Sequence, residues 1–217
     1  ATPTATIPPF CIGPVLRIGD VQGTGDTSPY SGTVVSVRGV VVGDYEGASP
    51  NLRGWYIQDE GDGDPLTSDA IYVFDFDTAT DQVSAGQLIS ITGLATEFSG
   101  QTQLTNFTLQ VCGAAALPAP VDVSLPFANA SVPERYEGML VRLPQDLTVT
   151  DNFPLGRFGA VRVSANGRLF NPTNIITPGA PAIAQQAANN LNLLFIDDPL
   201  NNQNPDPVIF GGASAQL

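Results

Sequence analysis

Alternation of apolar and polar residues runs through the first half of the chain and predicts a series of β-strands. The first strand is long and rich in valine, and Gly39 would permit a bulge or a sharp bend within it. Ser99 and Gly100 separate the last two strands and are typical of a tight hairpin turn. The predicted strands span residues 33–45, 54–59, 69–76, 86–98 and 101–112.

Five strands, of which the first is long and bent at a glycine, favour a closed five-stranded barrel of the OB type over residues 15–113. A barrel of this type usually carries a helix between its third and fourth strands. Only residues 77–85 are available for that helix, and they would form at most one turn. Residues 1–14 are rich in threonine and proline, and we expect them to form an extended N-terminal arm.

The second half of the chain predicts a smaller, β-rich α+β region over residues 134–210, after an Ala/Pro-rich connector at 114–133. Asn166–Gly167 is a strong signal for a hairpin turn, and residues 181–192 hold the one plausible helix. Residues 211–217 read as an irregular tail. The predicted fold class is therefore mainly β.

Charge is distributed unusually in this chain of 217 residues. All eight cations are arginines, there is no histidine, and 21 carboxylates bring the net charge to −13. A chain so acidic repels polyanions unless arginines cluster locally, because most nucleic-acid binders gain affinity by releasing counterions from phosphates. Without histidine, Ser–His–Asp and Cys–His catalytic arrangements are impossible.

Two cysteines, Cys11 and Cys112, lie far apart and belong to no CxxC pair, and without histidine a zinc site is a poor interpretation. We therefore predict a disulfide, which implies an oxidising compartment and a secreted, extracellular protein. The first residues read as a processed mature end, and no apolar run is long enough to span a membrane. Asn106 and Asn129 stand in possible glycosylation triplets.

A dense group of carboxylates follows the second predicted strand. Asp62, Asp64 and Asp69, with hydroxyls at residues 67 and 68, offer hard oxygen ligands on a glycine-rich loop, which suits Ca²⁺. The alternative is a solvated hairpin loop whose aspartates form Asx-turns. The sequence leaves both interpretations open.

Aromatic residues on the second and third predicted strands lie where OB barrels stack the bases of single-stranded nucleic acid, with help from cations. Both faces of these strands are apolar, so one set of side chains belongs to the core, and the other is either exposed or covered by another segment. Acidic residues beside the strands would repel phosphate. The candidate nucleic-acid-binding residues are Arg38, Arg53, Trp55, Tyr56, Tyr72 and Phe74.

Long ordered stretches, VQGTGDTSPYSGTVVSVRGVVVGDY, GWYIQDEGDGDPLTSDAIYVF and VSAGQLISITGLATEFSGQTQL, resemble the OB-fold domain of secreted bacterial nucleases of the endonuclease/exonuclease/phosphatase superfamily. A later stretch, ERYEGMLVRLPQDLTVTDNFPLGRFGAVRVSANGRLFNPTN, resembles the segment that links this domain to the catalytic domain. The resemblance implies a module associated with a metal-dependent nuclease, and a C-terminal nuclease domain as its partner.

Because the chain has no histidine and no room for the catalytic sandwich, we expect it not to be an enzyme. The leading hypothesis is a non-catalytic extracellular OB-fold module that binds nucleic acid or positions substrate. The alternative is an extracellular structural or assembly protein that reuses the fold, with an N-terminal arm that adds to a neighbour's sheet.

Overall fold

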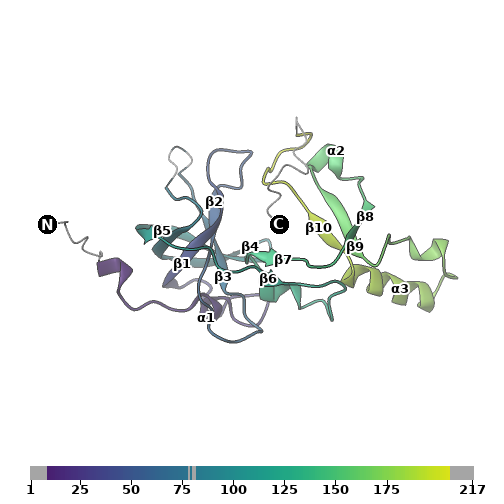
Figure 1. The fold of residues 1–217 in the computed structure, drawn as a ribbon, viewed down its shortest axis with the longest axis horizontal. Coiled ribbons are helices and arrows are strands. Elements are labelled where there is room, and N and C mark those ends of the chain that lie inside the picture. The colour runs from purple at the N-terminus through teal and green to yellow at the C-terminus, as the bar shows by residue number, and fades with distance from the viewer. Residues whose placement is uncertain (1–8, 78, 80–81, 206–217) are drawn as a thin grey trace. The chain divides into compact units, whose positions relative to one another are not determined.

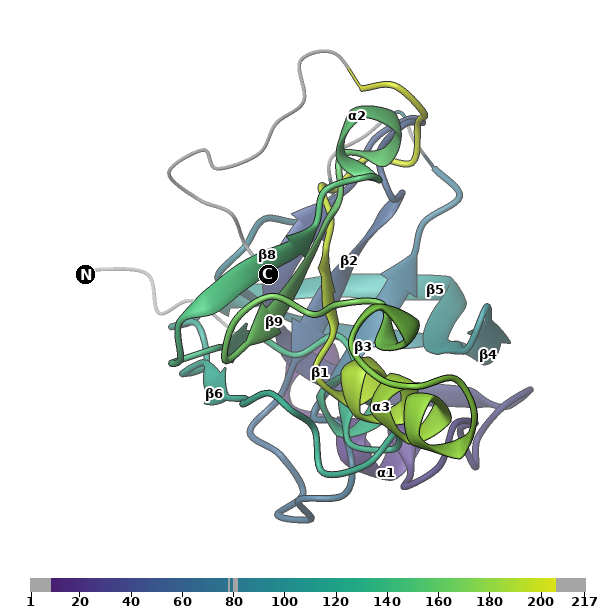
Figure 2. The same cartoon turned by 90° about the vertical axis from the view of Figure 1, so that its right-hand side faces the viewer.

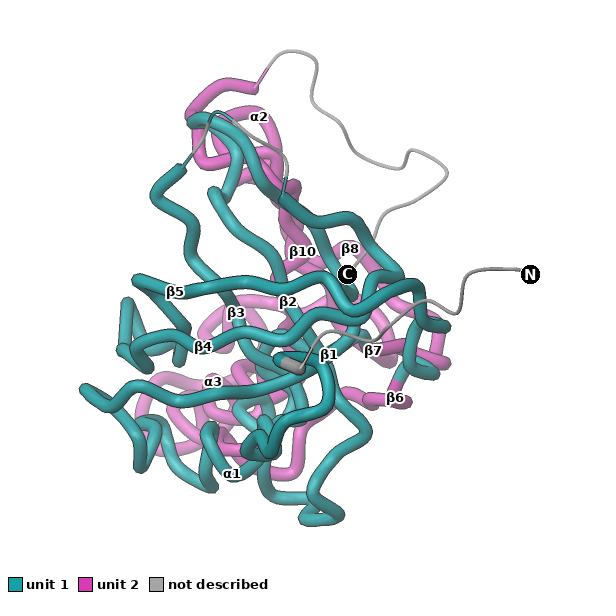
Figure 3. The backbone as a smooth tube through the Cα atoms, turned by 90° about the vertical axis from the view of Figure 1, so that its left-hand side faces the viewer, with its two compact units in different colours: residues 1–120, 133–140 teal, residues 121–132, 141–217 magenta. Residues whose placement is uncertain are grey.

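A computed structural model describes residues 9–77, 79 and 82–205 (Figure 1). Contacts divide the chain into two compact units, shown in different colours in Figure 3. The first comprises residues 1–120 and 133–140, and the second comprises residues 121–132 and 141–217. Strands hold 35% of the described residues and helices 16%, which confirms the predicted mainly β fold class.

Five strands of the first unit close into a barrel in the order β1-β2-β3-β5-β4, as the alternating pattern predicted. Strands β3 and β5 are parallel, and every other neighbouring pair is antiparallel. The strands are β1 (Val34–Tyr45), β2 (Gly54–Gln58), β3 (Ala70–Phe74), β4 (Gln87–Phe98) and β5 (Gln101–Ala114).

Strand β1 closes the barrel by changing partner near its middle. It pairs with β4 up to Val40 and with β2 from Val40 onward. Gly39 lies at this change, where a Cβ atom would stand 2.9 Å from the carbonyl oxygen of Gln58. A side chain at residue 39 would therefore push β2 away and open the barrel. The predicted β4–β5 turn is also present, with positive φ angles at Ser99 and Gly100.

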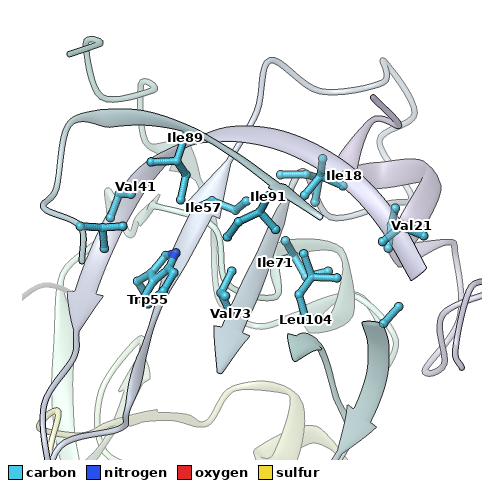
Figure 4. Close-up of a cluster of buried hydrophobic side chains, with 14 residues drawn as sticks. Ile18, Val21, Val41, Trp55, Ile57, Ile71, Val73, Ile89, Ile91 and Leu104 are labelled. Carbon is cyan, nitrogen blue, oxygen red and sulfur yellow. The ribbon is translucent and has the colours of Figure 1, made fainter. Parts of the chain in front are cut away.

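The barrel core consists of aliphatic side chains from every strand together with Trp55 (Figure 4). Helix α1 (Ile18–Gln22) adds Ile18 and Val21 to this core and packs against β1 and β3. We predicted no helix at this position from the sequence. The structure shows no helix in the described part of residues 77–85, of which 78, 80 and 81 lie outside the described residues. The apolar residues that a helix contributes to the core therefore precede β1.

The second unit is built on a three-stranded antiparallel sheet in the order β10-β9-β8 (Figure 2). A two-stranded parallel pair, β6 with β7, accompanies it. The predicted helix at 181–192 is confirmed as α3. The elements are β6 (Val121–Asp122), β7 (Val141–Arg142), β8 (Leu147–Asp151), α2 (Leu155–Phe158), β9 (Val161–Ala165), η3 (Pro172–Asn174), α3 (Ala180–Leu191) and β10 (Leu194–Ile196).

The predicted hairpin around Asn166–Gly167 is wrong in one respect. Both residues have positive φ angles, so the turn exists, but β9 pairs with β8 and β10 rather than with the residues that follow the turn. Leu169 is held instead by the side chain of Thr150, whose Oγ1 accepts the Leu169 N–H at 2.7 Å. A side-chain hydrogen bond here replaces a strand ladder.

The unit boundaries also differ from the predicted ones. Residues 134–140, which we assigned to the second region, belong with Pro133 to the barrel unit, and 121–132 of the predicted connector belong to the second unit. Hydrogen bonds from residues 137 and 140 to the barrel explain the first difference, as described below. The predicted tail at 211–217, and the first eight residues of the predicted arm, lie outside the described residues.

The predicted disulfide is present. It joins Cys11, in the short 3₁₀ helix η1 (Pro9–Cys11), to Cys112 on β5, across a sequence separation of 101 residues. Both sequon residues, Asn106 and Asn129, are exposed, and their glycosylation stays a prediction. Among the described residues, no helix is both long and apolar enough to cross a membrane.

Candidate ligand-binding surfaces

The predicted base-stacking face is divided by the barrel wall. Pairing in β2 and β3 places Trp55 inside the barrel, fully buried, with its ring 5.3 Å from the ring of Phe107 in an edge-on contact. Trp55 is therefore a core residue, and its assignment to a nucleic-acid surface is wrong. Alternation left the choice of face open, and the curvature of the closed barrel decides it.

Tyr56 and Tyr72 do lie on the outer face, yet they are held in structural contacts. Their ring centroids are 4.8 Å apart, and Tyr72 is only 5% exposed. The Tyr72 hydroxyl donates to the carbonyl oxygen of Leu52 at 2.7 Å, and burial raises the pKa of this hydroxyl. The Tyr56 hydroxyl accepts from the side-chain amide of Gln101 at 3.0 Å. Neither ring presents an open face for a base.

A segment of the same unit, residues 133–140, covers part of this outer face, and we call it the strap. It begins with the 3₁₀ helix η2 (Pro133–Tyr136). A Cβ atom on Gly138 would stand 2.7 Å from the ring of Tyr56, so the backbone there lies directly against the tyrosine. The N–H of Leu140 donates to the side-chain carbonyl of Gln58 at 3.0 Å. We expected the second apolar face of these strands to be either exposed or covered by another segment, and the strap is that segment.

Glu137 fixes the centre of the strap to the barrel. Its carboxylate accepts the N–H of Thr102 on β5 at 3.1 Å and the side-chain amide of Gln22 at 3.4 Å. Its backbone carbonyl accepts the hydroxyl of buried Ser68 at 2.6 Å. Burial, then the nearby charge of Glu134, raises the pKa of the Glu137 carboxyl to about 7, against hydrogen bonds that lower it. Glu97, which accepts the Thr102 hydroxyl, adds to the rise.

We expect Glu137→Gln to stabilise the protein at pH 8 and to leave it unchanged near pH 4. Between pH 4.5 and about 7 the Glu137 carboxyl is protonated in the folded protein and ionised in the unfolded chain. The free energy of unfolding therefore falls as the pH rises through this range. The gain at pH 8 should be about 1–2 kcal/mol after a discount for partial exposure. Urea unfolding at both pH values measures it. Glu60→Gln, at a side chain 89% exposed, is the control, and an equal gain there would contradict the assignment.

One aromatic corner of the face remains open. Phe76 is 63% exposed, and its ring lies 4.9 Å from that of Phe74. The guanidinium of Arg53 lies 5.2 Å from the Phe74 ring centroid and donates to the Phe76 carbonyl. Buried Asp75, which accepts the side chain of Gln82, stands between the two phenylalanines in sequence. Of the predicted residues, only Arg53 and Phe74 are brought together at an accessible surface.

Arg38 lies away from this corner and borders a groove of about 810 Å³ on the barrel unit. Its guanidinium donates to the carbonyl of Gly13 at 3.0 Å and to that of Phe10 at 3.4 Å. The walls combine residues 15–17, 38–40, 58–60, 115, 116 and 118 with Leu88. Among them Val15, Leu16, Val40, Leu88, Ala115, Ala116 and Pro118 are apolar.

Two of the three predicted calcium residues, Asp62 and Asp64, accept hydrogen bonds from their own loop. Asp62 accepts the N–H of Asp64 at 2.7 Å and the hydroxyl of Thr67 at 3.0 Å, and Asp64 accepts the N–H of Leu66. Burial raises the pKa of Asp69. In the described part of the chain, no group of three or more potential metal-ligating side chains is placed to hold a metal ion. Asx-turns, the alternative interpretation, account for Asp62 and Asp64, and calcium binding stays a prediction.

Sequence reasoning missed the strap and the groove. Glu137 is followed by Gly138 at a φ of +70°, and a Glu–Gly pair signals a turn without saying what the turn packs against. The groove walls come from five separate segments. No protein-family model matches the chain, and a search of curated proteins gave no match.

Proposed function

We propose that this chain is a non-catalytic, extracellular OB-type protein that associates with other copies of itself. The observation that carries the proposal is the apolar surface beside the disulfide. Phe10 and Ile12, on either side of Cys11, are exposed, Ile12 by 68%, and the Phe10 carbonyl accepts a hydrogen bond from the groove residue Arg38. Leu117, also exposed, lies in sequence between two groove residues, Ala116 and Pro118. Exposed apolar side chains gathered beside a groove are typical of protein–protein contact surfaces.

The disulfide and the covered OB face both support this proposal. The bond between Cys11 and Cys112 fixes the start of the described chain to β5, and disulfides persist in oxidising, extracellular settings. The strap, and the contacts that hold Tyr56 and Tyr72, leave little of the usual OB surface for bases. A net charge of −13 also opposes binding to a polyanion.

Salt dependence tests this function. Copies that carry −13 repel one another, so we expect the oligomeric fraction to grow as salt rises from about 10 mM to about 0.3 M, where screening is stronger. Light scattering after gel filtration, with electron microscopy of concentrated samples, measures the size distribution. A chain that stays monomeric at every salt and protein concentration contradicts self-association.

A second candidate function is weak binding of single-stranded nucleic acid at the open corner formed by Arg53, Phe74 and Phe76. An exposed phenylalanine beside an arginine offers one stacking surface and one cation. This function would be compatible with the resemblance to nuclease-associated OB domains. The affinity for nucleic acid should fall as the salt concentration rises, because binding releases counterions from the phosphates. This is the opposite of the salt dependence expected for self-association.

Fluorescence anisotropy with a labelled single-stranded DNA at low salt tests this second candidate. We expect Phe76→Ala to reduce the affinity by about tenfold, the effect of about one stacked base. Phe98→Ala is the matched control, since Phe98 is exposed to a similar degree but lies at the end of β4. No binding at low salt, or equal losses for the two variants, rules the candidate out.

A further inference from the structure

The groove beside η1 combines an apolar surface with a balanced set of charges. Seven of its lining residues are apolar. Its two arginines, Arg17 and Arg38, are balanced by two carboxylates, Asp59 and Glu60. Arg17 forms an exposed ion pair with Glu60 at 3.6 Å. The local net charge is therefore zero on a protein whose total is −13. Its volume, about 810 Å³, falls within the usual range for ligand sites.

An occupant of this groove should be largely apolar and uncharged. A second copy of the chain is repelled everywhere that its carboxylates meet those of the first. The repulsion is smallest where both contacting surfaces are neutral. Residues 1–8, ATPTATIP, bring no carboxylate to such a contact, and the first charged side chain in the sequence is Arg17.

Residues 1–8 are joined in sequence to an element that is itself linked to the groove. They precede η1, which is bonded to β5 by the disulfide and whose Phe10 carbonyl accepts Arg38, a groove residue. The chain after η1 runs into the groove wall at Val15. The proposed self-association supplies a second copy, whose residues 1–8 bring no carboxylate to the groove of the first.

We propose that the groove binds residues 1–8 of a second copy of this chain, with Ile7 as the apolar anchor. The inference rests on the proposed self-association and names its two contacting surfaces. The contact joins different surfaces of the two copies, so it is heterologous. Repetition of a heterologous contact that does not close on itself produces an open chain of copies.

Two complementary variants test the contact. The first lacks residues 1–8 and keeps the groove. The second, Val40→Arg/Ala116→Arg, keeps residues 1–8 and fills the groove from two of its walls, with Ala116 exposed and Val40 half-buried. Val34→Arg/Ala130→Arg is the matched control, because it adds the same arginines at two exposed positions outside the groove. Thermal melts confirm that each variant folds.

We expect each variant alone to be monomeric, and a one-to-one mixture to form a two-chain complex and nothing longer. The control should assemble as the unchanged chain does. Assembly of the groove-filled variant to the normal extent, or a mixture that stays monomeric, overturns the groove contact while self-association itself stands.

A full chain that is monomeric under all conditions overturns both the contact and the proposed function. If deletion of residues 1–8 then exposes groove amides to hydrogen exchange, the occupant is the chain's own segment and the second-copy assignment is wrong. Light scattering and hydrogen exchange together separate these results.

Discussion

Replacing both cysteines, Cys11→Ala with Cys112→Ala, is expected to destabilise the barrel unit by about 4–5 kcal/mol, on the chain-entropy account of a loop of this length. The disulfide closes 101 residues of sequence and so restricts the unfolded chain strongly. For a chain of this size the melting temperature should fall by about 10–15 °C. Calorimetry or circular dichroism under oxidising conditions measures the shift.

Reduction of the unchanged protein provides the control for this variant. With the disulfide broken, the unchanged chain should melt at the temperature of the double variant, because both then lack the same covalent link. A fall of less than about 3 °C in both cases would mean that the unfolded chain is already compact around these residues. The described part of the arm would then be held by its non-covalent contacts, among them the hydrogen bonds from Arg38.

Trp55→Ala is expected to destabilise the protein by about 3–5 kcal/mol, the usual cost of removing a large aromatic side chain from a core. Trp55 is fully buried among Val41, Ile57 and Val73 in the barrel cluster, and it contacts Phe107 edge-on. Urea unfolding followed by circular dichroism measures the loss. Because Trp55 is the single tryptophan, its fluorescence should also resist quenching by acrylamide in the unchanged protein.

Phe76→Ala serves as the comparison for Trp55→Ala. Phe76 is a large aromatic residue of the same unit, yet its exposure means that truncation should change stability by less than about 1 kcal/mol. A similar loss for the two variants would contradict the division of this face into a buried and an open set. Quenching of Trp55 by added single-stranded DNA would contradict it as well.

Much of the barrel was predictable because its signals are local. Alternation over residues 33–45 and 86–98 marks long strands, and it needs only the two-residue repeat of a β-strand. Ser99–Gly100 marks a turn because glycine adopts positive φ at little cost. With only two cysteines in the chain, there was one possible pair.

The candidate surfaces were not predictable in the same way. Strand β3 is apolar on both faces, so alternation could not decide whether Tyr72 or Val73 pointed inward. The predicted hairpin after β9 was wrong in its pairing. The Asn166–Gly167 signal identified the turn correctly, but it could not show that β9 pairs with β8. Helix α1 was missed because five residues carry too little periodicity to recognise.

The sequence by itself determined the strands, the β4–β5 turn, the disulfide pair and the charge, since each depends on neighbouring residues or on composition. Tertiary structure alone decided that Trp55 is core, that Glu137 holds a strap over the outer face, and that a neutral groove lies beside η1. The physical reason is sequence separation. Glu137 and Thr102 lie 35 residues apart, and the groove walls extend from residue 15 to residue 118, so only barrel closure brings them together.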